Sequence, residues 1–251
     1  MELGLHCWEM GKIRDLDTMV EICRESGMAC LEIMENPGFK SQVPLDTPAK
    51  ERARIRKLFS DAGVAIAALS IECRYHYKDE AEVRKNIEET KQYVQLAKDV
   101  GAPRLRCLGD QLYDDEPKET TIARVVKALR EVCEYADGFG IDCPIEMHGH
   151  FSPWENSLAV VQGVDHPRCY LVHNGTPVNT PPDNWDEVWA KIRPYLKHAH
   201  VHDILSERFP HKKYFRALRD SGYDGFVCLE LKPSDDPVRV LKLTRALVEE
   251  W

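Results

Sequence analysis

The sequence lacks the motifs that mark several common classes of protein. No run reaches the roughly 18 consecutive apolar residues of a membrane-spanning helix, so we expect no membrane segment. Neither GxGxxG nor GxxxxGK(S/T) occurs, and the usual dinucleotide and P-loop phosphate sites are therefore without their key residues. Positive charge is also in deficit, since 34 Lys and Arg face 42 Asp and Glu, for a net charge of −8. Binding to phosphate backbones relies on clustered basic residues, so we expect no nucleic-acid partner.

The nine cysteines form no CxxC pair, and most of them lie inside apolar runs. Small buried thiols of this kind are typical of a reducing compartment. The first residues lack the basic and apolar regions of a secretory signal. We therefore expect a cytoplasmic protein. Its 43% hydrophobic and 30% charged residues are ordinary for a globular chain, and its acidic net charge favours a small ligand.

Short β-rich runs alternate with longer helical patterns along the whole chain. Five helical patterns end at a glycine that is followed at once by an apolar run: Gly27, Gly63, Gly101, Gly140 and Gly222. This repeated unit predicts a parallel sheet covered by helices. We expect strands near 2–7, 28–33, 63–70, 103–108, 141–147, 168–173, 197–202 and 225–230. We expect helices near 14–26, 48–62, 79–100, 118–139, 154–163, 184–194, 211–221 and 235–250.

Eight such units predict a single (β/α)8 TIM barrel over residues 1–251, because that fold typically takes about 250 residues. An open doubly wound sheet is the alternative, and length alone would also allow two small domains. No domain linker or low-complexity segment separates the units. The long stretch 175–183 follows the sixth expected strand, where it would serve as a cover for an active site or as a plain connector.

Four residues of metal-ligand type lie near the ends of the last four expected strands. They are Glu146, His173, His200 and Glu230, at intervals of 27, 27 and 30 residues. Residues that leave successive strand ends of a closed barrel converge in space, which predicts a metal-assisted active site. A carboxylate in the barrel mouth is costly unless positive charge compensates it. The alternatives are a helix cap for Glu146 and a rim ion pair with Lys232 for Glu230.

Three alternating histidines, His198, His200 and His202, face one side if they lie on a strand. His200 is the candidate ligand, whereas a hydrogen-bonded core histidine is the better interpretation of His198. His202 and Asp203 would reach the level of the loops and contact substrate. Further residues near the expected mouth are candidates for substrate binding, and Arg106 or Lys232 would hold an anionic group. The alternative for each is a rim ion pair or a lumen network. These further candidates are His6, Glu32, Arg106, His148 and Lys232.

Three segments resemble motifs of the xylose isomerase-like TIM barrel family, which includes sugar phosphate isomerases and epimerases. They are Glu146-Met-His-Gly, Lys197-His-Ala-His-Val-His-Asp203 and Leu229-Glu-Leu, and Gln95-Leu-Ala-Lys-Asp-Val-Gly-Ala-Pro is similar to a further passage. The resemblance covers essentially the whole chain. It implies a metal-dependent isomerase or epimerase of a small carbohydrate, acting by proton abstraction beside a carbonyl through an enediolate. It also implies one divalent ion held by Glu146, His173 or Asn174, His200 and Glu230, with both glutamates handling protons.

The chain departs from the family pattern at the sixth strand. Family members usually carry Asp where this chain has Val172-His173-Asn174. If His173 binds, two imidazoles suit Zn, Mn, Fe or Co better than Mg. If neither His173 nor Asn174 binds, the chain is a metal-independent or non-catalytic sugar-binding descendant. A dehydratase or lyase acting on a keto-sugar or cyclitol is a close alternative, the acidic balance counts against an endonuclease IV-like hydrolase, and a homo-oligomer stays open.

Overall fold

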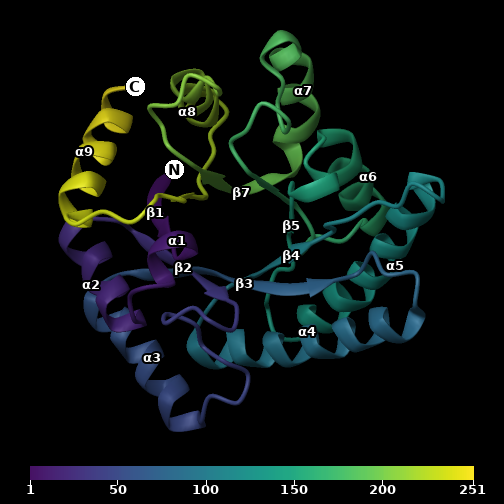
Figure 1. The fold of residues 1–251 in the computed structure, drawn as a ribbon, viewed down its shortest axis with the longest axis horizontal. Coiled ribbons are helices and arrows are strands. Elements are labelled where there is room, and N and C mark those ends of the chain that lie inside the picture. Colours follow the sequence, from purple (N-terminus) through teal and green to yellow (C-terminus); the bar gives the residue numbers. More distant parts are fainter.

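The computed structural model describes residues 1–251 and is a closed barrel of eight parallel strands, each paired with its sequence neighbours. The first strand also pairs with the last, and the helices form a ring outside the strands (Figure 1). The predicted single TIM barrel is therefore confirmed. The strands are β1 (Glu2–His6), β2 (Cys30–Glu35), β3 (Ala65–Arg74), β4 (Leu105–Leu108), β5 (Ile145–Glu146), β6 (Leu171–His173), β7 (Leu196–Val201) and β8 (Phe226–Leu229).

Each of the eight helices expected from the sequence is present, and one further single-turn helix, α1, follows β1. All five glycines expected at helix ends have positive φ, as a left-handed terminating residue requires. Short 3-10 turns precede α6 and lie on both sides of α7. The α-helices are α1 (Trp8–Gly11), α2 (Leu16–Ser26), α3 (Ala49–Ala62), α4 (Glu80–Val100), α5 (Lys118–Asp137), α6 (Trp154–Val164), α7 (Trp185–Ile192), α8 (His211–Asp220) and α9 (Pro237–Glu250).

The fifth strand is much shorter than the expected 141–147. Pro144 has no N–H to donate to a neighbouring strand, so the regular ladder is restricted to Ile145 and Glu146. The extended backbone nevertheless continues on both sides. Cys143 N donates to Arg168 O at 2.9 Å, and Met147 N donates to Val172 O at 3.0 Å. Glu146 is therefore held firmly at the end of its strand.

The main core lies between the strands and the helices, and all nine cysteines are buried and unpaired. The barrel interior is different near the carboxyl ends of the strands, where charged side chains are buried. His6, Glu32, Arg106, Glu146, His198 and His200 are all less than 5% exposed. Buried charge needs partners, and these residues supply them to one another. No helix has the length and apolar character needed to cross a bilayer.

Candidate active site

Three of the four residues expected to bind a metal come together at the barrel mouth. His200 Nδ1 lies 3.3 Å from Glu146 Oε1 and 3.4 Å from Glu230 Oε1. One donor atom from each of the three side chains lies within 4.8 Å of the others. Parallel pairing explains the convergence, because β5, β7 and β8 end on the same side of the barrel. We call Glu146, His200 and Glu230 the carboxylate–imidazole group.

His173 lies outside this group, contrary to the expectation. Both of its ring nitrogens are occupied, since Nε2 is 2.7 Å from Thr180 Oγ1 and Nδ1 accepts from Gly175 N at 3.0 Å. Its ring stacks on Tyr214 of α8 at 4.8 Å, and burial lowers its pKa to about 3. Successive side chains of a strand point to opposite faces, so His173 faces the helices while its neighbours face the lumen. It is a neutral, packed histidine.

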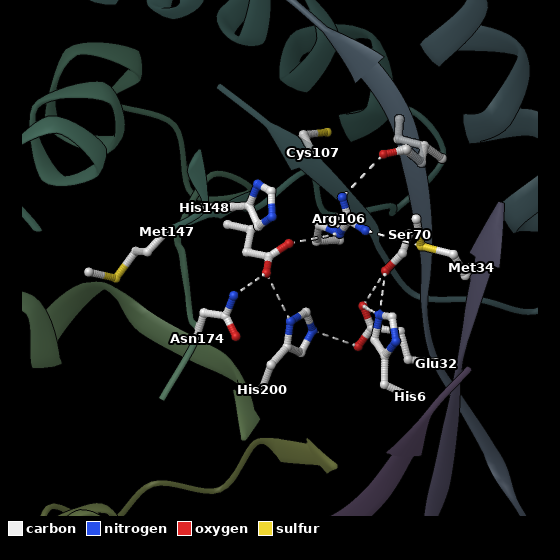
Figure 2. A network of polar contacts seen from close by, with 12 residues as sticks. His6, Glu32, Met34, Ser70, Arg106, Cys107, Met147, His148, Asn174 and His200 are labelled. Carbon is white, nitrogen blue, oxygen red and sulfur yellow. Dashed lines mark hydrogen bonds and ion pairs between the residues drawn. The ribbon is translucent and has the colours of Figure 1, made fainter. Parts of the chain in front are cut away.

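Asn174 occupies the place that His173 does not. Its Nδ2 donates to Glu146 Oε1 at 2.9 Å, and Figure 2 shows its side chain turned toward the same point as His200 and Arg106. Asn179, a fully buried residue of the following loop, accepts from Asn174 N at 2.8 Å and fixes this strand end. The amide oxygen of Asn174 is buried and has no hydrogen-bond partner. An unpaired buried acceptor beside Glu146 indicates a place for a ligand.

A second buried carboxylate, Glu32 of β2, supports the imidazoles from below. Glu32 Oε2 is 3.0 Å from His200 Nε2 and 2.6 Å from His198 Nε2, while Oε1 accepts from Ser70 Oγ. His6 Nε2 lies 3.5 Å from Oε1. Glu32 is fully buried and reaches these groups rather than a substrate (Figure 2). The sequence indicated Glu32 and His6 as substrate contacts, and the structure places both in this supporting layer.

The charges in this network depend on one another. Burial favours neutral Glu32, but His200, His198 and His6 outweigh it and hold the pKa of Glu32 well below its usual value. Burial likewise disfavours the His200 cation, but Glu32 and Glu146 raise the pKa of His200 well above its usual value. His198 remains neutral because burial lowers its pKa to about 4. When no metal ion is bound, the positive charge of protonated His200 therefore compensates negative charge on Glu32 and Glu146.

Arg106 of β4 adds a permanent positive charge. Its Nε lies 3.2 Å from Glu146 Oε2, and its two terminal nitrogens donate to Ile71 O at 3.3 Å and to Met34 Sδ at 3.4 Å. Burial of Glu146 opposes ionisation, but Arg106 and then His200 hold the pKa of Glu146 well below its usual value. The Nε–H is buried and has no aligned acceptor. Arg106 thus holds Glu146 ionised.

The remaining candidates lie higher, at the rim. His148 Nδ1 is 3.7 Å from Asp110 Oδ1, and the nearby Asp110 carboxylate raises the pKa of His148. His202 is 43% exposed, and its Nδ1 lies 3.3 Å from Glu230 Oε2. Asp203 is exposed and caps the turn that follows β7 by accepting from Leu205 N at 3.0 Å. Lys232 is exposed and, together with Glu230 and His202, lines a hollow at the barrel mouth. His148, His202 and Lys232 are accessible to a substrate.

The loop 175–183 is a tied connector rather than a free cover. Asn179 Nδ2 donates to Met147 O at 3.1 Å and to Ser152 O at 2.9 Å, and Thr180 is fully buried against His173. Gly175 starts the loop with φ of 37°, and a Cβ there would stand 2.9 Å from His200 O. Only glycine allows the loop to pass so close to β7. The loop therefore fixes the end of β6 beside His200.

The donor set fits a divalent cation. Two atoms bound at about 2.0–2.1 Å to a tetrahedral ion stand about 3.3–3.4 Å apart. The contacts of His200 Nδ1 with Glu146 Oε1 and Glu230 Oε1, at 3.3 and 3.4 Å, have this spacing. Glu32 is placed to accept from the other ring nitrogen of His200, the arrangement by which a carboxylate orients a histidine ligand. The fourth ligand was expected at His173, and the adjacent Asn174 has a buried Oδ1 without a hydrogen-bond partner.

Two polar members of the site had no signal in the sequence. Ser70 lies within β3 and meets Glu32, which is distant in sequence, only through the pairing of β2 with β3. Arg104 precedes β4, and its Nη1 lies 3.0 Å from His198 Nδ1. This contact assigns the Nδ1 lone pair of neutral His198 to Arg104 and its Nε2–H to Glu32. Strand parity would have placed both side chains in the lumen, but only barrel closure gives their partners.

The fold and the site define a family. A family model described as xylose isomerase-like TIM barrel matches residues 20–247, and the chain belongs to that family. Among solved structures, D-psicose 3-epimerase with D-tagatose from Clostridium cellulolyticum H10 aligns with a TM-score of 0.83 at 15% identity, covering 100% of this chain and 99% of that one.

Two further structures are similar over their whole length. The 3-keto-D-glucoside 4-epimerase YcjR from E. coli aligns with a TM-score of 0.81 at 13% identity and full coverage of both chains. The IOLI protein with a bound zinc atom aligns with a TM-score of 0.77 at 17% identity, covering 99% of this chain and 98% of that one. At these identities the likeness shows the shared fold.

Proposed function

We propose that this protein is a metal-dependent isomerase or epimerase of a sugar or sugar derivative. The observation that carries the proposal is the carboxylate–imidazole group, in which Glu146 Oε1 and Glu230 Oε1 both lie beside His200 Nδ1, at 3.3 and 3.4 Å. Proton abstraction beside a carbonyl needs one carboxylate to remove a proton and a second group to return it. Epimerases of keto-sugars among the structures of the same fold support this choice of reaction.

Glu146, His200 and Glu230 would hold one divalent ion, with Asn174 Oδ1 as the candidate fourth donor. The bound ion would stabilise negative charge that develops on the carbonyl and hydroxyl oxygens of the substrate. The imidazole in this set favours Zn, Mn, Co or Fe over Mg. The zinc atom in the IOLI structure is compatible with that preference.

The two glutamates differ in what they contact. Glu146 is paired with the Arg106 guanidinium at 3.2 Å, so its charge is strongly stabilised and it is the weaker base. Glu230 has no guanidinium partner and contacts imidazoles, His200 and His202 most closely, so we assign proton removal to it. Glu230 Oε2 therefore takes the proton beside the carbonyl, and exposed His202 connects this carboxylate with solvent. Glu146 or His148 would then return a proton to the substrate.

Arg106 and His148 place positive charge near the substrate oxygens on the β4 side of the mouth. Arg106 Nε lies 3.2 Å from Glu146 Oε2 and so keeps a permanent positive charge at this carboxylate. Its position next to Glu146 suits the oxygen that becomes negative as the enediolate forms. A dehydratase or lyase acting on a keto-sugar or cyclitol would begin with the same proton abstraction, and product analysis separates it from an epimerase.

The test combines metal analysis with isotope exchange. We expect about one divalent ion per chain and solvent deuterium exchange at the carbon beside the carbonyl of D-tagatose, D-fructose or L-ribulose. Glu230→Gln should abolish exchange, because the amide cannot take up the proton. Glu72→Gln is the matched control, since Glu72 is a mouth carboxylate that pairs with Arg74 Nη2 at 2.8 Å. Full exchange by a metal-free protein would refute the metal mechanism.

A further inference from the structure

A hollow of about 620 Å3 opens directly beside the carboxylate–imidazole group. Glu230 and His202 form its inner end, and its walls come from α1, α9 and the loops after β7 and β8. Binding sites for small organic molecules commonly measure about 300–1,000 Å3. Because Glu230 belongs to both the group and the hollow, a substrate held over Glu230 extends into this space.

The outer walls of the hollow are unusually apolar for an exposed surface. Seven large hydrophobic side chains are exposed in the whole chain, and four of them line this one hollow: Trp8, Leu205, Val240 and Leu243. Leu205 is 74% exposed and Leu243 is 62% exposed. Scattered apolar residues are normal on a protein surface, but a gathered set indicates a binding surface.

These apolar walls are held in position rather than left loose. The backbone N–H of Trp8 donates to His6 Nδ1 at 2.9 Å, and the Lys12 ammonium lies 4.5 Å from the centre of the Trp8 ring. On the opposite wall, Asp203 accepts from Leu205 N at 3.0 Å and from Ser206 N at 3.0 Å. The hollow is thus preformed, as small-molecule sites usually are. Trp8 is also connected through His6 to the supporting layer under His200.

We infer that the substrate is a glycoside of a keto-sugar whose aryl or alkyl group, an apolar substituent, occupies this hollow. This inference rests on the proposed function and specifies the substrate class of the same site. The sugar ring lies over Glu146 and Glu230, and the substituent lies against Trp8 and Leu243. A free keto-sugar carries hydroxyl groups around its whole ring and would leave these side chains uncovered. A protein docked on the same surface would close the route to Glu230.

The test is a binding measurement that needs no turnover. By calorimetry, phenyl β-D-glucoside should bind the metal-loaded protein at least tenfold more tightly than methyl β-D-glucoside. Leu243→Ser and Trp8→Ala should each reduce that ratio to less than threefold while leaving the affinity for methyl β-D-glucoside unchanged. Ile13→Ser is the matched control, because Ile13 is an exposed aliphatic residue outside the hollow and its loss should leave the ratio intact.

Equal affinities of the wild-type protein for the two glucosides would overturn the inference. A dimer in sedimentation that Leu243→Ser dissociates would overturn it too, since the surface would then bind a second copy. The outcome is independent of the test of the proposed function. If the phenyl advantage is absent while Glu230→Gln still abolishes deuterium exchange, the subsite fails and the isomerase stands. If the phenyl advantage is present while neither a free ketose nor phenyl 3-keto-β-D-glucoside exchanges deuterium, the subsite stands and the reaction fails.

Discussion

Two buried glutamates on β2 provide a matched pair of substitutions, Glu32→Gln and Glu35→Gln. The residues lie three positions apart, and both are less than 5% exposed. Their surroundings are opposite in kind. Glu32 is surrounded by His6, His198 and His200, whereas both oxygens of Glu35 accept only from Val43 N, at 3.1 and 3.2 Å. The same chemical change should therefore have opposite effects at the two positions.

Glu32→Gln should weaken metal binding without removing a ligand. A carboxylate at Glu32 accepts the Nε2–H of His200 at 3.0 Å and leaves Nδ1 free to face Glu146 and Glu230. A glutamine amide has no charge, and its NH2 can turn toward His200 and favour the tautomer that carries its proton on Nδ1. Loss of such a supporting carboxylate typically lowers metal affinity about 10–100-fold, which corresponds to about 1.4–2.7 kcal/mol.

The metal-free form of Glu32→Gln should also be less stable. The structure buries Glu32 and His200 as an ion pair, and breaking such a pair costs about 3–5 kcal/mol. The depressed pKa of Glu32 means that its ion-pair stabilisation is present above pH 4.5 and is lost as pH falls through its lower folded value. The variant should therefore lose stability mainly at neutral pH and approach the wild type in acid.

Glu35→Gln should do the reverse. Burial raises the pKa of Glu35 to about 8, so folding opposes its ionisation. The contribution of Glu35 to the free energy of unfolding is fully present below pH 4.5 and is lost as pH rises from 4.5 through 8. Glutamine does not ionise and keeps an oxygen to accept from Val43 N. The variant should be more stable than the wild type by about 4 kcal/mol near pH 8 and about equal to it near pH 4.5.

The assay has two readouts for each variant. Competition with a chelator gives the affinity for Zn2+ or Mn2+, and urea unfolding from about pH 3 to pH 8 gives the free energy of unfolding. A folded Glu32→Gln protein with wild-type metal affinity would refute the supporting role of Glu32. A stability difference between Glu35→Gln and the wild type that does not change with pH would refute the account of Glu35.

Other substitutions test the strand-six end and the cation on β4. Asn174→Asp restores the carboxylate expected from the family and should raise metal affinity about tenfold, as measured by competition with a chelator. It should lower the stability of the metal-free protein, measured by unfolding, because the new carboxylate then lies beside that of Glu146. Unchanged metal affinity would exclude position 174 from the metal site. His173→Phe should leave metal content near the wild-type value by metal analysis, and loss of the ion would show that His173 binds after all. Arg106→Met should lower the rate of deuterium exchange more than metal content, and equal losses would assign Arg106 to metal retention alone.

The architecture was predictable from local signals, because glycine at five helix ends and the apolar runs after them repeat through the chain. Local signals also gave the position of Glu146, His200 and Glu230 at strand ends. Barrel closure then brings any such residues together. The length of strand β5 was less predictable, because Pro144 lacks a backbone N–H donor but leaves the backbone extended on both sides.

The error at His173 has a simple physical origin. Its residue type suggested a ligand, but its strand parity points it to the helices, where Thr180 and Tyr214 receive it. Val172 pairs with Glu146 and His198, so the lumen-facing positions of β6 are Val172 and, after it, Asn174. Parity therefore carries more information than residue type at this strand end. The distance from Glu32 to three histidines, by contrast, depends on contacts between strands far apart in sequence.

The exposed apolar residues show a different limit. α9 buries Leu241, Thr244 and Val248 against the barrel and leaves Val240 and Leu243 outside. A helical pattern with apolar residues on more than one face does not say which face meets the core. In the fold, the outer face borders Glu230, whose carboxylate contacts His200 on one side and opens to the hollow on the other. Glu230 therefore borders the buried charged network on one side and exposed apolar side chains of α9 on the other, and the inferred substrate, with a sugar ring and an apolar substituent, matches both surroundings.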